Sequence, residues 1–461
     1  MLSVLRNRAY RRLFTAQAVA LTGTGLATVA LGLLAYDLAR DEASAVLGTA
    51  LAIKMIACVG IAPLAGALAD RIPRRTLLAA TDLVRAAVAL ALPFVSEIWQ
   101  IHLLVFVLQA ASATFTPVFQ ATVPELLPAE RDYTRALALS RLAYDLESLL
   151  SPALAAALLT LVSYGWLFTG TSLGFLASAA LVAATALPRP APVERTGGAF
   201  AGAAFAGAAF GARLFWATPR LRALLALDLA VAAAGAMVFV DTVVLVQGHF
   251  GRSAGAVSLA LGAYGAGSVL TALLLPRLLR RRTDRAVMLP AAFALPVVPA
   301  AVAVLTARAP DGWSWSGVLA GWAVIGAASC AVLTPGGRVV RRSAAAPDLP
   351  RAFAARFALS HGCWLLTYPL AGLLAAGAGL PVTALVLGAL SLAAAAAAAA
   401  VWPARDPSRL EHVHPDLPPD HPHLAGARPA ADGWRHGHHY VIDRHHRHWP
   451  SAGLTGPSRG R

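Results

Sequence analysis

The sequence has few charged residues for its length of 461, since Asp, Glu, Lys and Arg make up only 13% of it. That share is about half of what a soluble domain usually contains. Lys54 is the sole lysine, and cysteine occurs only at positions 58, 330 and 363, in apolar segments without a CxxC pattern. No phosphate-binding loop and no nucleophile–base set occurs. These absences argue against a soluble enzyme, and they predict neither direct use of ATP nor a bound cofactor.

The chain is instead rich in long apolar runs, and 58% of its residues are hydrophobic. A membrane-spanning helix needs about 20 mostly apolar residues. Twelve runs meet this requirement, at 13–38, 44–69, 76–96, 101–121, 136–162, 165–187, 220–246, 254–276, 286–307, 314–334, 351–377 and 381–402. The sequence therefore predicts an all-α integral membrane protein with twelve transmembrane helices in two pseudo-symmetric six-helix halves.

The interruptions between these runs predict the domain organisation. Residues 1–187 form an N-terminal half, 188–219 a central linker that could include a short interfacial helix, and 220–402 a C-terminal half. The remaining segment, 403–461, is polar and rich in Pro and His. Because it has no apolar run, we expect a disordered tail.

The formal net charge of +15 is spread over short clusters between the apolar runs. A nucleic-acid-binding protein would gather it on one basic face, so no nucleic-acid partner is predicted. If the N-terminus lies inside the cell, 23 arginines fall in inner loops before the tail, against only Arg40, Arg252 and Arg308 in outer loops. Inner loops of membrane proteins are enriched in positive residues. We therefore expect a multi-pass protein of the plasma (inner) membrane with both termini in the cytoplasm.

The loop between the second and third runs contains a spaced set of glycine, acidic and basic residues. The set comprises Gly66, Asp70, Arg71, Arg74 and Arg75, followed at helical spacing by Asp82 and Arg85. This pattern resembles the signature loop of major-facilitator transporters. The resemblance implies a monomeric secondary transporter in which the acidic residue caps a neighbouring helix and, paired with arginine, locks one face shut. Residues 119–128 resemble the end of span four in the branch that exports drugs and siderophores.

Ionisable groups inside the predicted spans are the candidates for proton coupling and substrate binding, because such groups are costly in a bilayer. The candidates are Lys54, Arg141, Tyr144, Asp145, Glu147, Asp228, Asp241 and His361. Arg141 and Asp145 are four residues apart on a helix and should neutralise each other. Glu147 or Asp145 is favoured as the proton carrier, with simple ion pairing as the alternative. The resemblance places spans five and eleven on one cavity, so a functional and a structural His361 are both open.

The tail contains ten of the thirteen histidines of the chain. They are His412, His414, His421, His423, His436, His438, His439, His445, His446 and His448. Imidazole binds divalent ions such as nickel, cobalt, copper and zinc. A histidine-rich tail after twelve spans resembles the nickel-resistance exporters of the same superfamily. The alternative is a solvated low-complexity tail without a ligand.

Three functions remain open from the sequence. The first is a proton-coupled exporter of divalent metal ions such as nickel or cobalt. The second is proton-coupled efflux of organic compounds, either drugs or siderophores. The third is a membrane-anchored metal sensor or store that transports nothing. In the first two, the partners are a small solute or metal ion, protons and the lipid bilayer.

Overall fold

The computed structural model describes residues 2–39, 43–187, 200–307, 311–404, 406, 409–415, 417–418, 420–443, 445–446 and 449–450. The N-terminal half begins with the 3-10 turn η1 (Leu2–Arg6). Its helices are α1 (Arg8–Ala39), α2 (Ala43–Arg71), α3 (Arg74–Ala91), the 3-10 turn η3 (Leu92–Phe94), α4 (Ile98–Leu126), α5 (Glu130–Leu159) and α6 (Tyr164–Ala183). A separate helix, α7 (Phe200–Ala217), follows in the central linker.

The C-terminal half contains α8 (Pro219–Val243), which continues as the π-helical turn η4 (Val244–His249), and six further helices. They are α9 (Ala254–Leu278), α10 (Asp284–Ala294), α11 (Val297–Thr306), α12 (Gly312–Leu333), α13 (Gly336–Arg341) and, after the turn η5 (Ala346–Asp348), α14 (Leu349–Val401). Each of the twelve predicted apolar runs therefore coincides with helix. Helices are the expected solution, because the bilayer offers no hydrogen-bond partners to the backbone.

Nine helical segments of the described residues are long and apolar enough to cross a membrane. One of them, Ala346–Val401, contains both of the last two predicted spans. Gly379 divides α14 there with a φ of 80°, a left-handed conformation that favours glycine. The predicted ninth span is likewise divided, into α10 and α11, beside Pro296. Proline cannot continue the helical hydrogen-bond pattern, so the span bends at this point.

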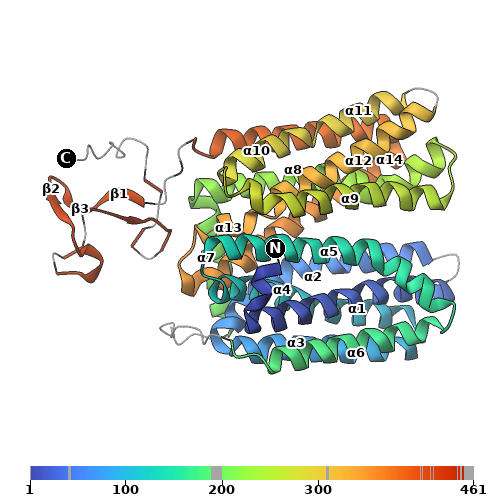
Figure 1. Ribbon diagram of the computed structural model, residues 1–461, viewed down its shortest axis with the longest axis horizontal. Helices are drawn as coiled ribbons and strands as arrows, with labels where there is room; N and C mark the ends of the chain where they lie inside the picture. The colour runs from blue at the N-terminus through green and yellow to red at the C-terminus, as the bar shows by residue number, and fades with distance from the viewer. Residues whose placement is uncertain are drawn as a thin grey trace.

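The two halves lie side by side as two layers of helices (Figure 1). Within the first half, α1 and α3 pack on α6, and α2 packs on α4. Within the second half, α8 and α11 pack on α14, and α9 packs on α12. The same pattern thus occurs in both halves, as expected for an internal repeat. The halves meet where α5 packs on α9 and where α2 packs on α14, an interface that we call the seam.

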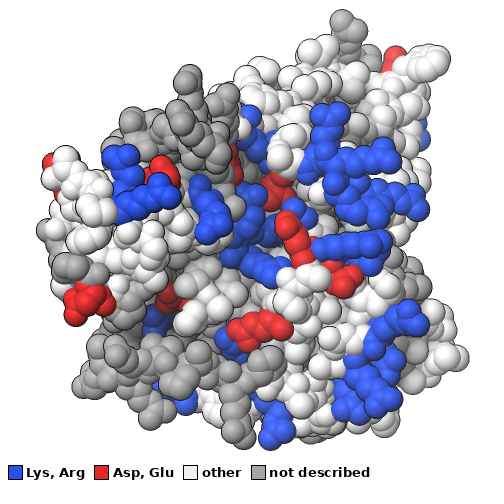
Figure 2. Space-filling model, turned by 60° about the vertical axis from the view of Figure 1, so that its left-hand side comes forward, with Lys and Arg blue, Asp and Glu red and all other residues white. Residues whose placement is uncertain are grey.

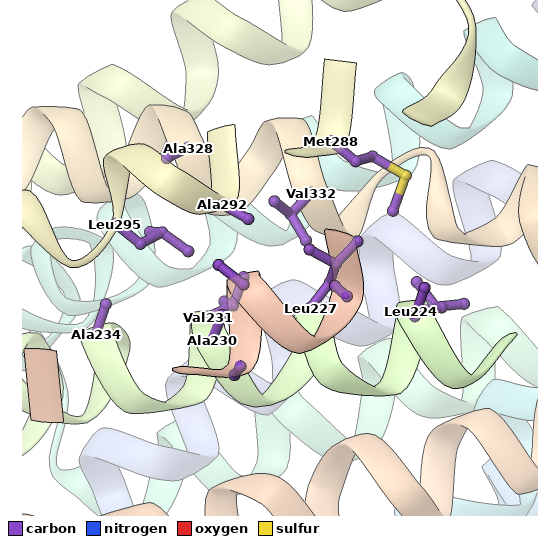
Figure 3. Packing of buried hydrophobic residues seen from close by; sticks show 14 of the residues in the cluster. Leu224, Leu227, Ala230, Val231, Ala234, Met288, Ala292, Leu295, Ala328 and Val332 are labelled. Carbon is purple, nitrogen blue, oxygen red and sulfur yellow. The ribbon is translucent and has the colours of Figure 1, made fainter. Parts of the chain in front are cut away.

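Small residues allow the helices of the second half to pack closely. Figure 3 shows alanines and branched side chains of α8 facing α10 and α12 in its buried core. A Cβ added at Gly267 in α9 would collide with the carbonyl oxygen of Ala323 in α12. A Cβ added at Gly326 in α12 would collide with the carbonyl oxygen of Tyr264 in α9. Such small-residue contacts are typical of helices inside membranes. The hydrophobic effect does not drive helices together there, so close packing has to hold them.

The tail differs from the predicted disorder, because it contains a three-stranded antiparallel sheet. The strands β1 (Arg409–His414), β2 (Arg428–Ala430) and β3 (Gly433–His439) are arranged in the order β1-β3-β2. Leu410, Tyr440 and Ile442 are buried in the same apolar core as the C-terminal half. This burial gives the tail the apolar contacts that a polar segment needs in order to fold. The sheet lies beside one end of the bundle, which we call the tail end (Figure 1).

Candidate functional site: the seam and the histidine cluster

The signature loop forms two ion pairs inside the N-terminal half. Arg74 at the start of α3 lies 2.6 Å from Glu125 at the end of α4. Asp82 pairs with Arg85 and accepts a hydrogen bond of 2.6 Å from the Ser178 hydroxyl of α6. Arg85 is buried although it is charged. These contacts tie α3 to α4 and α6.

The remaining members of the signature loop lie at its exposed edge or outside the described side chains. Arg71 and Arg75 are exposed to solvent. Gly66 and Asp70 lie in α2, but their surroundings fall outside the described residues. The capping and pairing of Asp70 that the family resemblance implies therefore stay a prediction.

Arg338 of α13 joins the two halves at the tail end of the seam. Its guanidinium lies 2.9 Å from Asp284 at the start of α10 and 2.5 Å from Glu130 at the start of α5. It also donates a hydrogen bond of 2.5 Å to the Thr134 hydroxyl. Arg341 donates to the backbone carbonyl of Pro128, at 2.6 Å. Contacts between sequence-distant segments of both halves thus close the tail end of the seam.

The same network extends to the tail. Arg342 lies 3.5 Å from Asp284 and 2.6 Å from Asp406, which follows α14. Asp406 also pairs with Arg220 of α8 at 3.1 Å. Because Arg338 and Arg342 both contact Asp284, a continuous series of ion pairs connects the tail to the N-terminal half.

In the middle of the seam, the predicted pair of Arg141 and Asp145 forms, with 2.9 Å between guanidinium and carboxylate. Ser268 of α9, which is fully buried, completes it from the other half. Its hydroxyl donates to Asp145 at 2.6 Å and accepts from Arg141 at 3.1 Å. A hydroxyl can do both at once, so this serine connects the two charges across the seam. The sequence signal for Ser268 is a polar residue in an otherwise apolar run.

Glu147 lies two residues after Asp145 in α5 and faces a different space. With Ser151 and Thr22 it lines a mostly apolar cavity of about 410 Å³ between α1 and α5. Lys54 of α2 acts electrostatically on both Glu147 and His361. The three groups therefore share one electrostatic environment although they come from α2, α5 and α14. His361 donates its Nδ1 hydrogen to the carbonyl of Phe357 at 2.8 Å, which leaves Nε2 as its acceptor.

The other predicted cavity residues lie apart from Glu147. Tyr144 lines a separate space of about 30 Å³ together with Arg85 and Gln17. Asp228 and Asp241 in α8 are buried, and none of their carboxylate oxygens has a hydrogen-bond partner among the described residues. Buried carboxylates of this kind are candidates for proton exchange during a transport cycle.

An aromatic group beside the seam was not predicted from the sequence. Phe239 of α8 contacts the rings of Tyr264 in α9 and Trp364 in α14, with ring centroids 5.3 and 6.0 Å apart. Trp364 in turn contacts Tyr368 at 5.0 Å. Tyr264 interacts electrostatically with Arg141, so the group adjoins the central triad. Rings spaced far apart in sequence give no pattern from which such a group could be found.

The tail brings six histidines together. The sheet pairs His412 with His436 and places His414 and His438 two residues further along their strands, on the same face. His423 comes from the segment before β2, and His446 comes from the segment after β3. Both approach this face of the sheet. We call these six residues the histidine cluster.

Four members of the cluster point their Nε2 atoms at one another. The separations around the ring are 3.0 Å (His412 to His414), 3.2 Å (His414 to His423), 3.3 Å (His423 to His446) and 2.9 Å (His446 to His412). A metal ion about 2.0–2.1 Å from each nitrogen would place neighbouring nitrogens about 2.9 Å apart in a square and about 3.4 Å apart in a tetrahedron. The observed separations lie within this range.

In two of the four histidines, the partner of the second ring nitrogen shows that Nε2 presents a lone pair. Nδ1 of His412 donates to the carbonyl of Leu410 at 3.2 Å, and Nδ1 of His446 donates to the carboxylate of Asp443 at 2.9 Å. In a neutral imidazole the other nitrogen is then an acceptor. Two lone pairs 2.9 Å apart repel unless a cation lies between them. A carboxylate behind a histidine is also the usual support of a metal ligand.

Four members of the cluster are held in the uncharged form near neutral pH. Burial, reinforced by the neighbouring imidazoles, lowers the pKa of His412 to about 3 and those of His414, His423 and His436 to about 4. Nε2 of His436 and of His438 is buried without a hydrogen-bond partner among the described residues. Neutral imidazoles with unused nitrogens are the form that binds metal. The donor set therefore fits a borderline divalent ion.

The other predicted tail ligands lie outside this arrangement. The rings of His421 and His445 lie edge to face beside the cluster, with ring centroids 5.1 Å apart. His439 is on the opposite face of β3 and is exposed. His448 lies outside the described residues. Six of the ten histidines of the tail thus belong to the histidine cluster.

Comparison with known families agrees with this architecture. The family model of the Major Facilitator Superfamily matches residues 13–317 and 229–439. The chain therefore belongs to the Major Facilitator Superfamily, and it is a multi-pass membrane transporter rather than an enzyme.

Two curated relatives share part of its sequence. It is 29% identical over 135 residues to the "Uncharacterized MFS-type transporter YfiS" of Bacillus subtilis (strain 168), covering 29% of this chain and 32% of that protein. It is 26% identical over 153 residues to "Macrolide efflux protein A" of Streptococcus pyogenes, covering 31% and 38%. The matched part thus spans about a third of the length of these relatives.

Solved structures share the fold at low sequence identity. The human organic anion transporter MFSD10 (TETRAN) superposes with a TM-score of 0.70 at 15% identity, covering 85% of this chain and 99% of that one. A bacterial homologue of the iron transporter ferroportin, in an outward-facing state, gives a TM-score of 0.66 at 13% identity with the same coverage. These likenesses show the fold alone.

Replacement of Glu130 by Gln should loosen the tail end of the seam. The variant removes one partner of Arg338 and leaves Asp284 in place, so no buried charge is orphaned. Because Glu130 is largely exposed, we expect a shift of only about two- to fivefold toward the open form. Spin labels at Ala129→Cys and Ala346→Cys, on opposite halves, would report it as a longer distance. Asp132→Asn breaks a partly exposed pair with Arg135 inside α5 and serves as the control; identical distances in both variants would contradict the role of Glu130.

The cluster can be tested by cobalt binding to the full-length protein. His412→Ala with His446→Ala should weaken binding by more than about 100-fold, because even a second-shell partner of a metal ligand contributes about 10- to 100-fold. The visible absorption of bound cobalt and calorimetry measure the effect. The control, His439→Ala, removes a histidine from the opposite face of β3 and should change little. A loss as large as that of the double variant would mean that the tail binds metal only as a histidine-rich chain.

Proposed function

We propose that this transporter is a proton-coupled exporter of divalent metal ions such as nickel or cobalt. The observation that supports it best is the histidine cluster, whose four Nε2 atoms lie 2.9–3.3 Å apart in a ring. The distribution of arginines favours a cytoplasmic tail end, in the plasma membrane, with both termini inside. An exporter would meet its metal on that side.

In this proposal the conformation described above is closed to the cytoplasm. Arg338 holds the tail end of the seam shut with Glu130 and Asp284. Opening requires only the exposed Glu130–Arg338 pair to separate, at small cost, because Asp284 lies in the same half as Arg338 and can stay bound to it. The cluster then offers the ion to an opening that forms next to it.

Inside the membrane, the ion would meet isolated donors rather than a closed site. Among the described residues, the tail alone contains three or more His, Cys, Asp or Glu side chains close enough to share a metal. Asp145 is bound to Arg141 and Ser268, Glu147 lines an apolar cavity, and His361 is bound to a backbone carbonyl, so the three groups have different direct neighbours. Weak, successive contacts suit a transporter, because conduction through a pathway requires that each site release its ion.

Efflux of organic compounds is the second candidate. It is favoured by the aromatic group of Phe239, Tyr264, Trp364 and Tyr368, which adjoins the Arg141–Asp145 pair. Aromatic faces beside fixed charges bind apolar or cationic organic molecules. The relative named as a macrolide efflux protein agrees with this alternative. In that case, the tail would sense or store metal separately from the transported compound.

Flux measurements separate the two candidates. The full-length protein is reconstituted in vesicles with an imposed proton gradient, and movement of nickel, cobalt, zinc and an organic dye is followed. Metal export predicts metal flux that collapses when a protonophore removes the gradient. Gradient-dependent movement of the dye without movement of any metal would overturn the first proposal and support the second.

The proton-carrying group can be identified by neutral substitutions. We expect Glu147→Gln to abolish accumulation driven by the gradient while substrate exchange at equal pH continues, since only the proton site is lost. Asp228→Asn and Asp241→Asn test the two buried carboxylates in the same way. Glu97→Gln, at the exposed start of α4, is the control. Unaltered coupling in Glu147→Gln would exclude that residue and leave the other two for comparison.

A further inference from the structure

A second charged region lies at the tail end, on the outer side of the seam. A cavity of about 700 Å³ opens between the first turns of α5 and the last turns of α9. Five arginines line it against a single glutamate, namely Arg131, Arg135, Arg277, Arg280, Arg338 and Glu130. Figure 2 shows that basic side chains gather on the face that contains the tail end.

Some of these arginines are neutralised within the protein and others are not. Arg338 pairs with Glu130 and Asp284, and Arg135 pairs with Asp132 at 3.1 Å. Within the part of the chain that is described, Arg131, Arg277 and Arg280 have no carboxylate partner. Cations that share one cavity repel each other, so the cavity favours an anion with more than one negative charge.

The wall of the cavity that continues along α9 is apolar. Leu273 and Leu274 line it, and their side chains are about half exposed, at 47% and 50%. Leu270, one turn further toward the middle of the bundle, is 60% exposed. Exposed leucines on a spanning helix face lipid chains. The cavity therefore combines a cationic base near the membrane surface with an apolar wall that leads into the bilayer.

We propose that this cavity binds the phosphate head group of an anionic phospholipid, with its acyl chains along Leu270, Leu273 and Leu274. Basic pockets between spanning helices at the membrane surface are suited to such head groups. A free phosphate anion could use the arginines but would leave the leucines without a role. Three arginines without carboxylate partners favour a lipid with two phosphates over one with a single phosphate.

The position of the cavity gives the lipid a structural consequence. α5 belongs to the first half and α9 to the second, so a head group that contacts Arg131 and Arg277 bridges the seam. Separation of the halves at the tail end would pull these arginines apart. The bound lipid therefore favours the closed tail end, in parallel with Arg338.

Native mass spectrometry of the full-length protein with cardiolipin tests the site. Arg277→Ala with Arg280→Ala should weaken cardiolipin binding by about 10- to 30-fold, as expected for two charges near a membrane surface. Arg281→Ala with Arg282→Ala removes the same charge from the adjacent turn, outside the cavity, and should change binding by less than about twofold. Equal losses in the two pairs would overturn the proposal, because they would indicate general attraction to a basic surface.

Two further measurements distinguish a bound lipid from a free anion in the cavity. Leu274→Gln should weaken cardiolipin binding by about fivefold, since half a leucine side chain loses its apolar contact. Neither inorganic phosphate nor glycerol phosphate should displace cardiolipin at millimolar concentration. Displacement by either one, together with no effect of Leu274→Gln, would assign the cavity to a soluble anion. Thermal unfolding of each variant confirms that the protein remains folded, and none of these outcomes depends on the transported substrate.

Discussion

The arrangement of the two halves and the tail depends on the ion pairs that the guanidinium of Arg338 forms. This guanidinium lies within ion-pair distance of Asp284 in its own half and of Glu130 in the other. Asp284 is 1% exposed, and its second basic neighbour, Arg342, is also bound to Asp406 after α14. Loss of one partner from a buried ion pair typically costs about 3–5 kcal/mol, because a charge is left uncompensated. The first half, the second half and the tail are therefore coupled through one buried carboxylate.

The ion pairs of Arg338 differ in strength. The Asp284 contacts are buried and stay within the second half, whereas Glu130 is exposed and belongs to the first. Exposed ion pairs contribute about 1 kcal/mol or less. The strong contacts thus fix α13 and the tail onto the second half, and the weak one closes the seam. A transporter that must open and close repeatedly needs this order of strengths.

The sequence predicted the membrane architecture well because the bilayer imposes it. Long apolar runs have to become helices, and positions such as Gly379 mark where one run ends. The Arg141–Asp145 pair followed from helical spacing for the same reason. Contacts across the seam could not be predicted, since Ser268, Glu130 and Asp284 meet only after both halves have packed. The aromatic group beside Tyr264 is likewise a product of packing between three helices.

The tail was wrongly predicted to be disordered because its composition was considered without the spacing of its histidines. Proline and histidine suggested disorder, but His412 and His414 alternate along β1 as His436 and His438 do along β3. Spacing of two is the strand period, so each His-x-His pair presents both imidazoles on one face. The buried Leu410, Tyr440 and Ile442 supply the apolar surface that a sheet needs.

A ring of four inward-facing nitrogens has a consequence for how metal would move through this protein. A closed site with four protein ligands holds its ion tightly, whereas a pathway requires sites that release it. The two requirements conflict if the cluster acts alone as a step in transport. The conflict is resolved if His436 and His438, whose Nε2 atoms are unused, exchange with members of the ring and pass the ion outward. Without such exchange, the cluster would retain its ion and act on the seam through Asp406, Arg342 and Asp284 as a sensor.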